Sequence, residues 1–149
     1  MDEAAIRGFI VQTFPDVSVV EGTGCTFFFT DPKKKFPFAT LSTSDEDDQA
    51  SDLGRPGVFR LNVGVSKQTF LNLFGTLPAS GGEGGYEYTA LDRIMPHPVY
   101  GKTYWVCVLN PSAETFETVR GLLAEDYEAG MRQRARRAER PSSSAGGAE

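Results

Sequence analysis

Two β-rich runs joined by three residues constrain the fold of this chain more than any other feature. The runs are VSVVE at residues 17–21 and CTFFFT at residues 25–30, and the joining residues are GTG. A connection this short between two such runs is typical of a hairpin. The chain therefore begins an antiparallel sheet before residue 31.

Three further β-rich runs predict a sheet of five strands. They are FPFATLST at residues 36–43, GVFRLNVGV at 57–65 and YWVCVLN at 104–110. Residues 44–56 are polar and contain helix and strand breakers, so they predict a surface loop. The glycine-rich residues 75–85 predict a flexible connection.

Apolar residues at helical spacing predict three helices around these strands. The first lies between a cap at Asp2 and a stop at Pro15, and the second runs from a cap at Ser66 to Phe74. The third begins in NPSAE, residues 110–114. Hairpin-connected strands with helices at both ends predict an α+β fold. We expect a two-layer sandwich, with a mainly antiparallel five-stranded sheet, helices on one face and the second face free.

The apolar pattern ends near residue 131. A chain of 149 residues fits one domain. We therefore expect a single α+β domain over residues 1–130. The tail over residues 131–149 is basic and then rich in serine and glycine, so we expect it to be disordered, although RQRARRAER could extend the last helix as a frayed end.

The charge distribution argues against general binding of nucleic acid. The net charge is −5, and the tail holds five arginines against two glutamates, which leaves −8 on residues 1–130. An acidic body repels phosphate backbones. No secretory signal and no membrane-length apolar run is evident, so we expect a cytoplasmic protein without a membrane association. In that compartment Cys25 and Cys107 are expected to be reduced core thiols.

The fourth predicted strand carries polar residues on one of its faces. Its apolar row includes Phe59, Leu61 and Val63, so Arg60 and Asn62 must project from the opposite face. Hydroxyls of the third strand, Thr40 and Ser42, are placed to share that face, and Trp105 is an aromatic that could border it. An arginine beside an amide and hydroxyls can hold an anion or a carboxylate. The alternative is that Arg60 only solvates an exposed sheet face.

The stretch DRIMPHPVYG, residues 92–101, holds the only histidine of the chain. Pro96 and Pro98 restrict the backbone to extended conformations, so His97 lies on a stiff connector. Three hypotheses stay open for this side chain: a hydrogen bond to a backbone carbonyl that pins the connector, a contact to a ligand, or a general base. A base needs an orienting partner, and Asp92 and Glu87 are the nearest carboxylates in the sequence.

Four motifs resemble an actinobacterial family that is described as a domain of unknown function. They are FPFATL, RPGVFRLNVGVSK, MPHPVYG and WVCVLNPS, and the resemblance covers most of residues 2–130. It implies no established activity. The element order also resembles MmcQ/YjbR-like proteins, which implies a small α+β fold with a sheet backed by helices. Some of these proteins are described as binding DNA, but this chain has acidic loops where basic ones would be needed.

These observations favour a small protein that binds a small molecule, which could be anionic, on the open sheet face. The expected ligand-binding residues are Arg60, Asn62, His97 and Trp105. One alternative is a small-molecule tailoring enzyme in which His97 is the catalytic base and Arg60 holds an anionic substrate, so the sequence leaves open whether the protein is an enzyme. Another is a nucleic-acid or protein adaptor that uses Lys33–Lys35 and the basic tail.

We expect no cofactor and no metal site. The acidic run DEDD at residues 45–48 lacks the spacing of a calcium loop, and one histidine with two distant cysteines does not make a zinc site. The free sheet face or an edge strand could equally form a homodimer interface.

Overall fold

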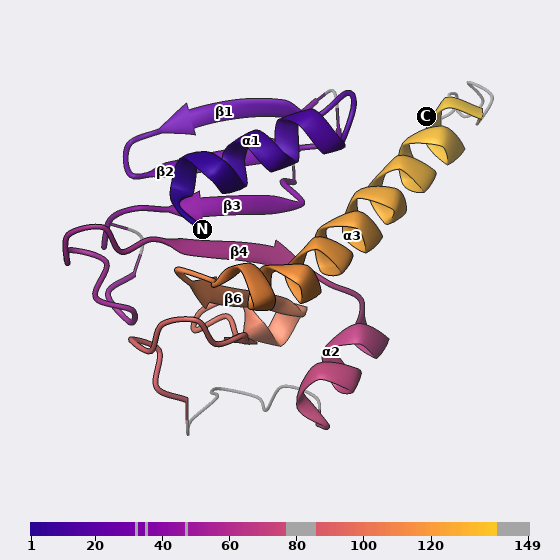
Figure 1. Ribbon diagram of the computed structural model, residues 1–149. Coiled ribbons are helices and arrows are strands. Elements are labelled where there is room, and N and C mark those ends of the chain that lie inside the picture. The colour runs from indigo at the N-terminus through magenta and orange to yellow at the C-terminus, as the bar shows by residue number, and fades with distance from the viewer. Residues whose placement is uncertain (32, 35, 47, 77–85, 140–149) are drawn as a thin grey trace.

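The computed structural model describes residues 1–149 except 32, 35, 47, 77–85 and 140–149 (Figure 1). The elements in chain order are α1 (Glu3–Thr13), β1 (Ser18–Gly22), β2 (Cys25–Phe29), β3 (Ala39–Ser42), β4 (Arg60–Gly64), α2 (Lys67–Phe74), β5 (Met95–Pro96), the short 3-10 helix η1 (Gly101–Thr103), β6 (Trp105–Leu109) and α3 (Ala113–Glu139). Most of the predicted glycine-rich connection lies outside the described residues.

The strands form one antiparallel sheet in the order β1-β2-β3-β4-β6-β5. The predicted α+β fold and the hairpin between β1 and β2 are confirmed. The sheet has six strands where five were expected, because Met95 and Pro96 pair with Cys107 and Val106 of β6. Proline lacks a backbone donor, and the edge position of β5 suits it.

Local signals set the ends of the helices as the sequence predicts. The Asp2 side chain accepts a hydrogen bond from the Ala5 amide at 2.8 Å, and Ser66 accepts one from the Thr69 amide at 3.0 Å. Gly75 closes α2 in the left-handed conformation that glycine adopts without strain. α3 continues to Glu139, past the expected boundary at residue 130, and residues 140–149 of the tail lie outside the described part of the chain.

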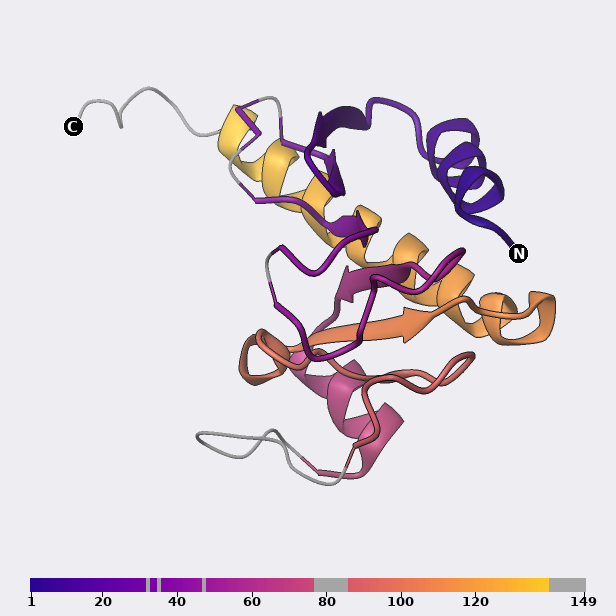
Figure 2. The same ribbon diagram turned by 90° about the vertical axis from the view of Figure 1, so that its left-hand side faces the viewer.

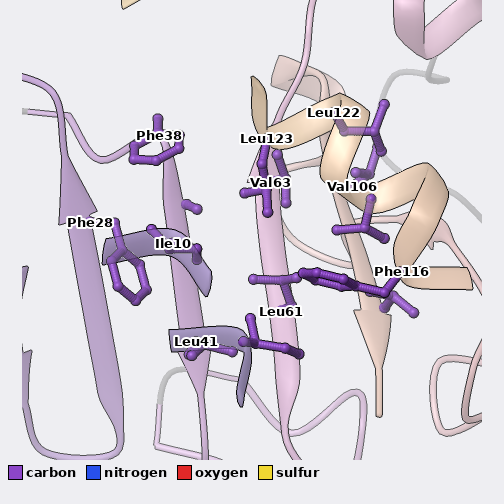
Figure 3. Close-up of a cluster of buried hydrophobic side chains, with 14 of the residues drawn as sticks. Ile10, Phe28, Phe38, Leu41, Leu61, Val63, Val106, Phe116, Leu122 and Leu123 are labelled. Carbon is purple, nitrogen blue, oxygen red and sulfur yellow. The ribbon is translucent and has the colours of Figure 1, made fainter. Parts of the chain in front are cut away.

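The main hydrophobic core lies between the sheet and the helices α1 and α3. Ile10 of α1 and Phe116 of α3 are packed against Leu41, Leu61 and Val106 of the strands (Figure 3). α1 lies on one side of the strands when the sheet is viewed from its end (Figure 2). α3 runs obliquely to the strands, as Figure 1 shows.

The second face of the sheet is buried as well, which corrects the expectation of a free face. Arg60 and Asn62 are each only 2% exposed. Leu53, from the segment between β3 and β4, forms a second small core there with Cys107 and Leu109. The polar composition of that segment predicted a solvated loop. It covers the face because it contributes this leucine together with polar partners for the buried arginine.

Candidate functional site

The buried guanidinium of Arg60 is the centre of a polar network on the second face of the sheet. Strand alternation places it there, since Leu61 packs into the main core. Its Nε donates to Asn62 Oδ1 at 2.9 Å, and its Nη1 donates to Ser51 Oγ at 3.0 Å. Its Nη1 and Nη2 donate to the two carboxylate oxygens of Asp48 at 3.0 and 2.7 Å. This is the bidentate pairing that guanidinium and carboxylate groups favour.

Asn62 is fixed by the neighbouring strand. Its Nδ2 donates to Thr40 Oγ1 at 2.9 Å and to Ser42 Oγ at 3.0 Å. The pairing of β3 with β4 sets these contacts, because it places Thr40 opposite Asn62 and Ser42 opposite Arg60. The two hydroxyls therefore lie on the face predicted for them. Because these hydroxyls bind the amide nitrogen of Asn62, its side-chain carbonyl oxygen points at Arg60. Residues of β3 and β4 thus hold the guanidinium in place.

His97 approaches Arg60 from the connector before β6. Its Nδ1 accepts hydrogen bonds from the amides of Val99 and Tyr100, both at 3.0 Å. An imidazole nitrogen that accepts two hydrogen bonds carries no proton, so the proton of the neutral ring lies on Nε2. That Nε2 lies 3.5 Å from Arg60 Nη2. Two donors thus face each other, and no other described residue hydrogen-bonds Nε2.

Burial keeps the His97 ring neutral. The side chain is 4% exposed. This burial, and then the positive charge of Arg60, lower the pKa of His97 to about 3, although the Asp48 carboxylate opposes the shift. With its lone pair held by two amides, the imidazole is poorly suited to accept a proton near neutral pH. His97 does fix the connector in place, as the first hypothesis for this side chain expected. It does so by accepting hydrogen bonds from two backbone amides, and not by donating one to a backbone carbonyl.

The two carboxylates nearest to His97 in sequence lie elsewhere. Asp92 Oδ1 accepts from the Ser112 amide at 2.7 Å, just before α3, and Glu87 Oε2 accepts from Thr89 Oγ1 at 3.0 Å. The carboxylate that joins the network is Asp48, whose pKa is lowered mainly by its hydrogen bonds to Arg60. Sequence reasoning missed Asp48 and Ser51. The available signal was the arginine itself, because a buried guanidinium requires an anionic partner.

Trp105 lies at the other end of the sheet. It pairs with Gly64, the last residue of β4, whereas Arg60 is the first. Its indole ring lines a hollow between that end of the sheet and α3. The structure thus joins Arg60, Asn62 and His97 and separates Trp105 from them. It also settles which residues of β6 face the helices, because Val106 and Val108 belong to the main core.

The two cysteines are buried core residues. Neither Cys25 nor Cys107 forms a disulfide in the structure, and that both are reduced stays a prediction. Burial raises the pKa of the Cys107 thiol to about 12, and its Sγ donates to the Pro96 carbonyl at 3.8 Å. A thiol in this state is a poor nucleophile. In the described residues, potential metal ligands do not gather in groups of three or more.

The fold and this network define a small α+β domain with a buried arginine, aspartate, asparagine and histidine cluster on the sheet face opposite its helices. The chain belongs to a family of unknown function, DUF6194, whose family model matches residues 1–139. That match confirms the resemblance to a domain of unknown function and extends to the end of α3. No curated protein and no solved structure matches the chain. In the described part of the chain, every helix is too short or too polar to span a membrane.

Proposed function

We propose that the protein binds a small acidic molecule whose carboxylate or phosphate group replaces Asp48 on Arg60. One observation carries this proposal: the strands hold a buried guanidinium in place, and its bidentate partner is a carboxylate from a loop. The planar fork of arginine matches a carboxylate or a phosphate equally well. Asp48 would then occupy the ligand's place in the free protein.

The difference in burial within the ion pair supports an exchange of partners. The Asp48 side chain is 13% exposed, and that of Arg60 is 2% exposed. The donors are therefore fixed deep in the sheet, and the acceptor lies at the outer side of the network. Fixed donors favour binding because the protein loses little conformational entropy when the ligand binds.

Two further groups would contact the ligand once Asp48 has left. The Ser51 hydroxyl accepts from Arg60 and still has its own proton to donate. The Nε2 proton of His97, which now faces Arg60, would gain an acceptor. In this role His97 is a hydrogen-bond donor to the ligand, and its low pKa keeps it neutral. This geometry does not support His97 as a general base, because the lone pair of its Nδ1 already accepts hydrogen bonds.

The electrostatics require that the ligand be an anion. Leaving a buried guanidinium unpaired costs several kcal/mol, so a neutral molecule could not displace Asp48. The ligand must also compensate for the lost hydrogen bonds of the aspartate. We therefore expect wild-type protein to bind acids with more than one anchoring group more tightly than it binds acetate.

The experiment uses His97 as its reporter, since it is the only histidine. Imidazole NMR signals are followed during titration with acetate, inorganic phosphate and citrate, in wild type, D48A and E46A. D48A is expected to bind acetate about tenfold more tightly than wild type, because no internal carboxylate competes. Glu46 is an exposed residue of the same loop, so E46A removes the same charge without opening the site.

Two further results decide the outcome. R60K keeps the charge and loses the bidentate fork, so it should bind every probe weakly. Equal affinities in D48A, E46A and wild type would contradict the proposal. So would a complete lack of response to the three anions in folded D48A.

Three finer statements from the sequence also stay predictions. They are the cytoplasmic location, the actinobacterial range of the family and the MmcQ/YjbR-like character of the fold. A homodimer is likewise a proposal, and β1 is the longer of the two edge strands that could form it.

A further inference from the structure

The hollow that Trp105 lines is at the end of the sheet away from Arg60. It has a volume of about 840 Å³ and lies between α3, the end of β4 and the segment that joins β2 to β3. Its lining includes Lys33, Phe36, Gly64, Trp105, Asp126 and Arg134. None of these residues belongs to the network around Arg60, so the two places can be tested separately.

Asp126 and Trp105 meet over Gly64 in this hollow. A Cβ atom on Gly64 would lie 3.3 Å from Asp126 Oδ2 and 3.3 Å from Trp105 Cε2. Glycine thus allows a carboxylate and an indole ring to converge on one point. Carboxylate and aromatic face together are the groups that recognise an ammonium ion, one by charge and the other by cation–π attraction.

The Asp126 carboxylate has no compensating partner among the residues that the structure describes. No described residue donates a hydrogen bond to it, and no described cation lies within ion-pair distance. Burial raises its pKa to about 7, and the neighbouring Glu125 carboxylate adds to the shift. Glu125 itself accepts hydrogen bonds from the hydroxyls of Ser66 and Thr69 at 3.2 and 2.6 Å. A positive charge brought into the hollow would therefore find Asp126 unpaired.

The other end of the hollow is basic. Arg134 follows Asp126 by eight residues on α3, which is about 12 Å along a helix axis. Its Nη1 donates to the Thr30 carbonyl at 3.2 Å and to Met131 Sδ at 4.0 Å, which holds the guanidinium at the wall. Its Nη2 and Nε have no hydrogen-bond acceptor among the described residues. Lys33 lines the hollow from the β2–β3 segment, where Asp31 is the one acidic residue among the lining groups of that segment.

We propose that this hollow binds a small zwitterion, with its amine against Asp126 and Trp105 and its acidic group at Arg134 and Lys33. The separation of the two charged ends favours a molecule whose amine and acid are joined by several methylene groups. Phe36 and the indole ring would cover that apolar middle. The proposal is independent of the anion site at Arg60.

The test uses the single tryptophan of the chain as its reporter. Trp105 fluorescence and its indole NMR signal are followed during titration with 4-aminobutanoate, 6-aminohexanoate and 8-aminooctanoate. Hexylamine and hexanoate serve as probes with one charge each. At least one of the three amino acids should bind more tightly than either hexylamine or hexanoate. D126N should weaken that binding about tenfold, as expected for the loss of a charged hydrogen bond.

Matched variants separate the site from the fold. Glu128 is exposed on the same helix and does not line the hollow, so E128Q removes one negative charge and should bind like wild type. R134Q should remove the advantage of the amino acids over hexylamine. G64A should weaken all probes, because its methyl group would press against both the carboxylate and the indole ring.

The pH dependence gives an independent check. Binding in wild type should strengthen as the pH rises from 6 to 8, because Asp126 loses its proton in that range, and D126N should lack this trend. No saturable response to any amino acid, equal affinities in wild type and D126N, or equal affinities for hexylamine and the amino acids would each overturn the proposal.

Discussion

At the scale of single residues, the second face of this sheet depends on one buried guanidinium. Arg60 uses Asn62, Ser51 and Asp48 as acceptors, and its remaining donor faces the Nε2 of His97. A buried charge is stable only while such partners are present. Asp48 and Arg60 therefore form one site.

His97 and Asp126 should produce opposite pH effects on stability. The folded pKa of His97, about 3, is below its usual value of 6.5, so the unfolded chain binds the extra proton and the free energy of unfolding falls as the pH drops from 6.5. The folded pKa of Asp126, about 7, is above its usual 3.8, so stability falls as the pH rises from about 4 towards 7. Each slope approaches about 1.4 kcal/mol per pH unit.

Variants reveal the two slopes separately. Relative to wild type, H97N should gain stability as the pH falls from 6.5 to 4, and D126N should gain stability as the pH rises from 4 to 7. Urea unfolding at each half unit of pH measures both differences. Parallel curves for a variant and wild type would show that the residue's proton affinity does not change on folding.

At the scale of elements, the segment between β3 and β4 converts a half-covered sheet into one that is buried on both faces. Leu53 anchors this segment, being 3% exposed among Met95, Cys107 and Leu109. The Leu53 amide donates to Asp45 Oδ1 at 2.8 Å, which orders the turn around it. Asp48 and Ser51 are carried to Arg60 by the same segment.

Removing that anchor should loosen the cover over Arg60. We expect L53A to lower the free energy of unfolding by about 2–4 kcal/mol and to speed hydrogen exchange at the Leu53 amide. Leu91 is half exposed, so L91A is a matched control with an expected effect below about 0.5 kcal/mol. Similar losses in the two variants would mean that Leu53 does not hold the segment in place.

The elements also show which parts of the structure could be predicted from the sequence. The hairpin, the caps at Asp2 and Ser66 and the alternation along β4 depend on neighbouring residues, so they could be predicted. The two-residue strand β5 carries too little pattern to be recognised. The contact of Asp48 with Arg60 joins a polar loop to a strand 12 residues later, and no local rule predicts such a contact. Trp105 lies on the same face as Cys107, but strand parity does not reveal its distance from Arg60 along the sheet.

At the scale of the whole molecule, β4 connects two different environments. Its first residue, Arg60, is the centre of the network under the loop, and its last residue, Gly64, forms the floor of the hollow beside α3. The main core between the helices and the sheet lies next to both of these environments. The two proposed sites therefore share one rigid strand while using separate side chains.

This arrangement predicts cooperative unfolding of both ends together. Trp105 fluorescence reports on one end, and the ring signals of His97 report on the other. In urea the two should give the same midpoint, because both ends of the sheet pack beside one main core. Distinct midpoints would show that the covered second face unfolds as a separate unit.

The proposed anion site requires that Asp48 occupy the place of an external acid on Arg60. The most direct measurement is the thermal midpoint of D48A with and without acetate. Without acetate, the variant should lose about 3 kcal/mol, because Arg60 is left unpaired. Acetate at 100 times its dissociation constant should restore about 2.7 kcal/mol, and E46A should show neither effect. A D48A protein that is as stable as E46A, or whose midpoint does not respond to acetate, would contradict the account.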